Sequence, residues 1–124
     1  MIVTIVNRRN NKIVFSKAYE AKSFFLKLRG LMFKKTITND EALIFYRTSS
    51  IHTCFMRFPI DIIFLDINRK VIRIVDALGA WRMVYCKYAY YTIEAKGGTV
   101  SSKDIMVNDI LEFRHEGNIQ TILS

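Results

Sequence analysis

Hydrophobic residues along this chain fall in short runs separated by polar turn residues. Most of the runs are rich in β-branched and aromatic side chains, which favour strands. The predicted strands are Ile2–Val6, Lys12–Phe15, Ala42–Tyr46, Ile51–Met56, Ile60–Leu65, Val71–Val75, Tyr88–Ala95, Ile110–Arg114 and Ile119–Leu123. Many short strands without regularly intervening helices indicate a mainly β sandwich or barrel.

One early segment follows a helical pattern instead. Apolar residues recur at helical spacing from Phe24 to Met32, Ser23 can cap the first turn, and Gly30 suits the position after a helix. We therefore expect one short helix over residues 23–29, and a further helical turn between Val100 and Met106. With 124 residues the chain is long enough for a compact single domain, which we expect to span residues 1–124.

The longest apolar stretch, residues 51–66, contains the carboxylate of Asp61. Strand alternation places Asp61 on the same face as Ile63 and Leu65, and places Ile60, Ile62 and Phe64 on the other face. An unpaired buried charge costs about 3–5 kcal/mol, so we expect a buried ion pair between Asp61 and either Arg29 or Arg57. By the same reasoning, Glu94 is expected to pair with Arg82.

The net charge of +8 is concentrated near the start of the chain. Residues 8–35 contain nine basic residues and the single acid Glu20, whereas the rest of the chain is balanced. This pattern predicts a basic face, which either is simply solvated or binds an acidic protein, nucleic acid or an anionic lipid surface. Nucleic acid is the least favoured of these partners, because the nearby phenylalanines lie at helical core spacing.

Composition and short motifs restrict the chemistry further. No apolar run is long enough for a transmembrane segment, and the first residues do not resemble a signal peptide, so we expect a cytoplasmic protein. The two cysteines, Cys54 and Cys86, have no metal-binding spacing and are expected to be free thiols. The sequence shows no phosphate loop or metalloprotease motif, and we expect no metal and no cofactor.

Four residues are candidates for ligand binding: His52, Arg57, Trp81 and Arg82. Trp81 can offer a stacking face at the rim of a concavity, and the arginines can hold an anion or a carboxylate. A structural role is the competing interpretation for each of them, since His52 shares a predicted strand with apolar neighbours. A nucleophile would need a base nearby, and sequence proximity alone provides little evidence for one.

The order of landmarks along the chain resembles that of domain-of-unknown-function family 192, also called uncharacterised protein family 0127. The landmarks are Arg29–Met32, Ala42–Phe45, Ile51–Asp66, Ala80–Arg82, Ile93–Glu94, Gly97–Thr99 and Asn108–Asp109. The resemblance implies a compact β domain of jelly-roll-like or barrel-like topology with no established activity. Three positions depart from the family pattern: Ala80 replaces a common proline, Ala95–Lys96 replaces a more apolar pair, and Asn108 replaces a glycine. Asn108 is therefore expected to adopt a glycine-like turn conformation.

Three hypotheses for function follow. The first, which we favour, is a non-enzymatic binding or accessory module that recognises a small polar or anionic ligand, for example a saccharide, or a segment of a partner. The second is a hydrolase that uses His52 with Asp61 or Glu94. The third is an adaptor that binds an acidic protein, nucleic acid or anionic lipid through residues 8–35.

Overall fold

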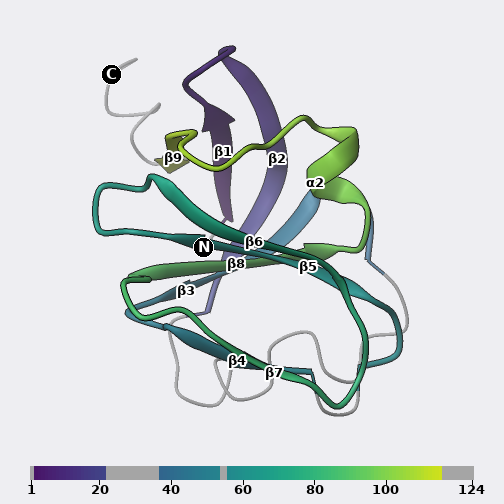
Figure 1. Cartoon of the computed structure of the whole chain (residues 1–124). Coiled ribbons are helices and arrows are strands. Elements are labelled where there is room, and N and C mark those ends of the chain that lie inside the picture. Colours follow the sequence, from purple (N-terminus) through teal and green to yellow (C-terminus); the bar gives the residue numbers. More distant parts are fainter. Residues whose placement is uncertain (1, 22–36, 54–55, 116–124) are drawn as a thin grey trace.

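The computed structural model of the chain describes residues 2–21, 37–53 and 56–115, and its architecture is mainly β (Figure 1). Seven strands form one sheet in the order β6-β5-β8-β3-β2-β1-β9. Their bounds are β1 Ile2–Asn7, β2 Lys12–Glu20, β3 Glu41–Tyr46, β5 Ile60–Leu65, β6 Val71–Leu78, β8 Tyr91–Lys96 and β9 Leu111–His115. A second sheet pairs β4 (Ser50–His52) with β7 (Met83–Tyr85), and a one-turn helix, α2, covers Thr99–Ser102.

The seven-stranded sheet curls until its two outer strands, β6 and β9, meet at one corner. Lys70, just before β6, forms a β-bridge with Ile110, just before β9. The Val71 N–H donates to the Asp109 carbonyl at 2.8 Å, and the Leu111 N–H donates to the Arg69 carbonyl at 3.0 Å. The result is a half-barrel, and it confirms the predicted mainly β fold. The described helix, α2, overlaps the helical turn expected between Val100 and Met106.

The sheet separates two hydrophobic cores. On the concave side, Ile63 and Leu65 of β5 pack with residues from β1, β2, β3, β8 and β9. On the other side, Ile62 and Phe64 pack under the two-stranded sheet, which contributes Ile51 and Val84. The predicted two faces of residues 60–65 are therefore confirmed, and every residue of β5 is buried because both faces are covered.

Element boundaries differ from the prediction where turns interrupt an apolar run. The strand expected over residues 51–56 ends at His52, the strand expected over residues 71–75 continues to Leu78, and the short strand β7 was not predicted. The strand expected from Tyr88 begins only at Tyr91, because the Ala89 N–H donates to the Cys86 carbonyl and closes a turn. The helix expected at residues 23–29 and the strand expected at 119–123 lie outside the described residues.

Two turn asparagines adopt the left-handed region, and one of them was predicted to do so. Asn108 has a φ of 78°, which confirms the glycine-like conformation expected there, and Asn11 in the β1–β2 turn has a φ of 56°. Asparagine tolerates this region better than most residues do. Within the described segments, no helix is long and apolar enough to cross a membrane.

Candidate functional site

The outer face of the two-stranded sheet carries an unusual number of exposed aromatic and apolar side chains. Trp81 is 64% exposed, Met83 76% and Tyr88 75%. Alternation along β7 turns Val84 towards the core, so Met83 and Tyr85 face outward. The surface formed by His52, Trp81, Met83, Tyr85 and Tyr88 is called the aromatic surface below.

Hydrogen bonds from Thr53 hold the loop that presents Trp81. The buried Thr53 hydroxyl donates to the Gly79 carbonyl at 2.6 Å and accepts from the Arg82 N–H at 2.8 Å. Its backbone N–H donates to the Arg82 carbonyl at 2.8 Å, and its carbonyl accepts from the Trp81 N–H at 3.1 Å. These bonds fix Trp81 at a φ of 61°, a strained value for a bulky residue. Sequence reasoning missed Thr53, although a hydroxyl within an apolar run indicates a buried hydrogen-bonding role.

The surroundings of the aromatic surface are basic. Residues 42–60 and 77–93, which contain β4, β7 and their flanking loops, include no aspartate or glutamate. They include four exposed basic residues, Arg47, Arg57, Arg82 and Lys87. The segments that carry this surface therefore contribute positive charge and no carboxylate to it.

Three of the four predicted ligand-binding residues lie on or beside this surface. His52 pairs directly with Met83 across the β4–β7 ladder, and Trp81 and Arg82 immediately precede β7. Arg57 is exposed at the bend before β5 and forms no hydrogen bond or ion pair with other described residues. The concavity expected beside Trp81 is not among the pockets described below, since neither of them is lined by Trp81.

Asp61 is fully buried, and among the described residues backbone N–H groups, and no arginine, bind its carboxylate. Oδ1 accepts from Ala77 at 2.7 Å and from Gly98 at 3.1 Å, and Oδ2 accepts from Val100 at 2.9 Å. The expected ion pair with Arg57 does not form, because Arg57 points to solvent while Asp61 faces the concave core. Arg29, the other expected partner, lies outside the described residues. Asp61 therefore connects β5 to the end of β6 and to the first turn of α2.

Glu94 is also buried, but on the opposite face of the sheet from Asp61. It pairs across the ladder with Ile62, whereas Asp61 pairs with Ala95 of the concave core. The expected pairing of Glu94 with Arg82 does not occur, because Arg82 is exposed beside β7. Among described residues, no hydrogen bond joins His52 to Asp61 or Glu94, so the acid–base pairs required by the hydrolase hypothesis are not formed.

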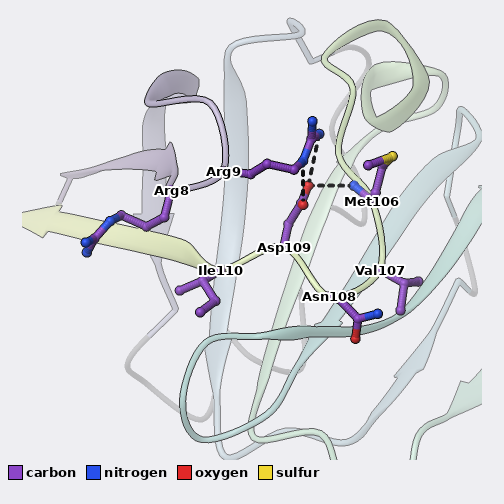
Figure 2. A pocket seen from close by; sticks show the side chains of 7 residues that line it. All are labelled: Arg8, Arg9, Met106, Val107, Asn108, Asp109 and Ile110. Atoms are coloured by element: carbon purple, nitrogen blue, oxygen red, sulfur yellow. Dashed lines mark hydrogen bonds and ion pairs between the residues drawn. The ribbon is translucent and has the colours of Figure 1, made fainter.

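A pocket of about 480 Å³ lies where β1 approaches the loop before β9 (Figure 2). At its wall, the Arg9 Nε donates to Asp109 Oδ1 at 2.7 Å, and Asp109 Oδ2 accepts from the Met106 N–H and from Asn7 Nδ2, each at 2.8 Å. Desolvation acts to raise the pKa of Asp109, but the hydrogen bonds from Arg9, Met106 and Asn7 together hold that pKa below its usual value. This cluster is structural, since all these groups are paired with one another.

The basic face predicted for residues 8–35 is described only in part. Arg9 is bound to Asp109 and Asp104, and Arg8 lies 3.7 Å from Glu112. These two cations therefore have intramolecular acidic partners, which sequence reasoning did not foresee. Lys22, Lys27, Lys34 and Lys35 lie outside the described residues.

A second polar cluster on the concave side was not predicted. The Tyr46 hydroxyl donates to Glu20 Oε2, and His115 Nε2 lies 3.3 Å from the same oxygen. Burial, followed by the hydrogen bond to Glu20, raises the pKa of Tyr46 above its usual range. The signal available in the sequence was Glu20 itself, the single acid among the first 35 residues.

In the described part of the chain, no three His, Cys, Asp or Glu side chains are placed to hold a metal ion. Cys86 is a partly buried free thiol at the edge of the second core. The described residues therefore form no metal-binding cluster, and the contact between a histidine and a carboxylate that they do form joins His115 to Glu20 and does not involve His52.

Comparison with known proteins gives one consistent family. The model of DUF192, described as an uncharacterized ACR, matches residues 5–113. A UPF0127 protein of Pyrococcus horikoshii is 38% identical over 105 residues, which cover 79% of this chain and 88% of the relative. A UPF0127 protein of Thermococcus kodakarensis is 31% identical over 116 residues, which cover 88% of this chain and 72% of the relative.

A solved structure has the same fold. The crystal structure of a protein of unknown function from Novosphingobium aromaticivorans superimposes with a TM-score of 0.78 at 22% identity. The match covers 90% of this chain and 84% of the other. At this level of identity, the likeness concerns the fold alone.

Proposed function

The chain belongs to the DUF192 family, whose members are uncharacterised, and from that premise we propose that it is a non-enzymatic binding module for an acidic segment of a partner protein. The observation that carries the proposal is the aromatic surface in its basic surroundings. Tryptophan, tyrosine, methionine and arginine are the residue types enriched at protein interfaces. All of them are exposed within residues 81–88.

The rigidity of the surface supports the same function. Residues that are held in place before binding lose less conformational entropy when a partner docks. Thr53 fixes the Trp81 loop through four hydrogen bonds between 2.6 and 3.1 Å. A partner segment carrying acidic side chains would be attracted by Arg57, Arg82 and Lys87, with Trp81 and Tyr85 as its apolar contacts. A cytoplasmic location is part of the proposal, since the free thiol of Cys86 suits a reducing compartment.

Trp81 offers a direct test because it is the only tryptophan of the chain. We expect extended peptides that alternate glutamate with leucine to shift its fluorescence emission to shorter wavelength, and peptides with lysine in place of glutamate to leave it unchanged. Affinity should fall steeply as salt rises from about 50 to 300 mM, because the attraction includes screened charges. Calorimetry provides the affinities for variants that lack the tryptophan.

Substitutions locate the binding surface. Trp81→Ala and Arg82→Ala should each weaken peptide binding by about tenfold, the effect of losing an interface residue worth roughly 1–2 kcal/mol. The matched control is Lys12→Ala, which removes an exposed cation on β2 and should leave affinity unchanged. The proposal fails if no acidic peptide binds, if Trp81→Ala binds normally, or if a panel of saccharides and not the peptides changes the Trp81 emission.

A further inference from the structure

A second pocket of about 480 Å³ lies at the corner where the two outer strands of the half-barrel meet. Its lining residues come from the turn after β1, the β5–β6 turn and β9 with the residue before it, and none of them belongs to the aromatic surface. The lining is mostly polar and includes Arg8, Asn68, Arg69, Glu112, Phe113 and His115. Two of these six side chains are arginines and one is acidic, and the histidine, His115, lies 3.3 Å from Glu20 Oε2.

Arg69 is the most firmly positioned of these residues. It occupies the left-handed region with a φ of 64° in the β5–β6 turn. In that turn, Asp66 Oδ1 accepts from the Asn68 N–H at 2.9 Å and from the Lys70 N–H at 3.0 Å. The Arg69 carbonyl accepts from the Leu111 N–H at 3.0 Å, so the backbone of the arginine is fixed to β9 as well.

Two aromatic rings fix the guanidinium. Its central carbon lies 5.2 Å from the ring centre of Tyr91 and 5.0 Å from that of Phe113, distances typical of cation–π contacts. Tyr91 and Phe113 are themselves buried and packed edge to face, with ring centres 5.4 Å apart. The orientation of Arg69 is therefore determined by the core and does not depend on a surface ion pair.

The hydrogen-bonding groups of Arg69 remain without acceptors in the part of the chain that the structure describes. The Nε atom is buried and has no hydrogen-bond partner there. Glu112, the carboxylate of the same pocket, is bound by Arg114 at 2.7 Å and lies 3.7 Å from Arg8. A guanidinium has five N–H donors and keeps its charge at any physiological pH, and a buried donor without an acceptor is unfavourable.

We propose that this pocket is a binding site for a small oxyanion, a carboxylate or phosphate group, with Arg69 as its principal ligand. The planar fork of a guanidinium matches two oxygens of either group, and its fixed position lowers the entropic cost of binding. Arg8 lies at the same pocket and is only loosely held by Glu112, so it can turn towards the anion. Glu112 keeps its 2.7 Å ion pair with Arg114 when Arg8 turns, and therefore does not repel the anion strongly. The site is independent of the peptide surface proposed above.

The probes are inorganic phosphate and acetate, titrated at constant ionic strength with chloride as the balancing ion. The readout is the Arg69 Nε–H resonance in a ¹H–¹⁵N spectrum, assigned by its loss in Arg69→Gln. We expect this signal to shift and saturate with at least one of the two anions, and their relative affinities distinguish a phosphate site from a carboxylate site. Absence of a saturable shift with both anions would overturn the proposal.

Variants test the role of each arginine. Arg69→Gln should weaken binding at least about tenfold, and Arg8→Gln should weaken it less. Lys70→Gln removes the same charge one residue away, outside the pocket lining, and should bind the anion as the unsubstituted protein does. Arg69→Gln lacks the Nε–H signal, so anion binding to this variant is followed by the chemical shift of the Leu111 backbone amide. Thermal unfolding verifies that the variant is folded. Equal affinity of Arg69→Gln and the unsubstituted protein, or equal losses in Arg69→Gln and Lys70→Gln, would show that Arg69 is not the ligand.

Discussion

At the scale of single residues, Asp61 shows how backbone N–H groups can bind a buried carboxylate. Three backbone N–H groups donate to it, at 2.7, 3.1 and 2.9 Å. Hydrogen bonds to an ionised acceptor are stronger than those between neutral groups, and three of them replace much of the lost hydration. The requirement for a hydrogen-bonding partner was inferred correctly from the sequence, but the three backbone donors were not predicted.

Asp61→Asn is expected to destabilise the fold by about 2–4 kcal/mol. The amide oxygen can still accept from Ala77 and Gly98, but the amide nitrogen then faces the Val100 N–H, and both groups are donors. Urea unfolding followed by circular dichroism measures the change in the free energy of unfolding. Asp76→Asn, at an exposed position, is the control. If Asp61→Asn were as stable as this control, the three backbone hydrogen bonds would not be important for stability.

At the scale of elements, the loop from Gly79 to Arg82 is held mainly by one threonine. Thr53→Val keeps the shape of the side chain but leaves the Gly79 carbonyl and the Arg82 N–H without their side-chain partner. We expect a loss of about 1–3 kcal/mol in the free energy of unfolding. We also expect lower fluorescence anisotropy of Trp81, because the loop gains local freedom.

Thr4→Val on β1 is the control for this experiment, since the Thr4 hydroxyl makes no hydrogen bond with other described residues. Its Trp81 anisotropy should equal that of the unsubstituted protein. An unchanged anisotropy in Thr53→Val would mean that Thr53 does not order the loop.

Sequence patterns predicted an element well where the preference of each residue type matches the conformation and burial that the fold requires of it. Residues 60–65 were assigned to the correct strand and faces because both faces of β5 are covered by apolar residues, and Asn108 was assigned its unusual backbone conformation from residue type. The end of β4 at His52 was not predicted, because Thr53 forms hydrogen bonds with the loop from Gly79 to Arg82 and does not continue the strand. The alternation of apolar and polar residues does not reveal such bonds. The Arg69 pocket could not be predicted either, since its lining comes from segments about 40 to 100 residues apart.

At the scale of the whole molecule, the closing of the sheet depends on charged groups near both ends of the described chain. Asp109 is bound by Arg9 and Asn7, which lie 100 and 102 residues away in sequence. The pKa of Asp109 is lower in the folded protein than its usual value. A lowered pKa means that the ionised carboxylate stabilises the folded state at neutral pH, and that this stabilisation is lost as pH falls below about 4 and through the folded-state pKa.

Asp109→Asn should therefore reduce the free energy of unfolding by about 1–3 kcal/mol at pH 7 and by much less at pH 2–3, where Asp109 itself is protonated. Urea unfolding at a series of pH values gives the two curves, which should converge in acid. Asp76→Asn again serves as the control and should run parallel to the unsubstituted protein. If the free energy of unfolding of Asp109→Asn differed from that of the unsubstituted protein by the same amount at every pH, a linkage between Asp109 ionisation and folding would be excluded.

The pairing of β1 with β9 has a consequence during synthesis. Ile5 of β1 is opposite Phe113 of β9, the last strand among the described residues, so the edge of β1 that faces β9 has no partner until nearly the whole described chain has left the ribosome. Until then, a nascent chain presents an open strand edge, the kind of surface to which chaperones bind and through which growing chains associate. The late arrival of residues 111–115 therefore converts an association-prone intermediate into a protected one.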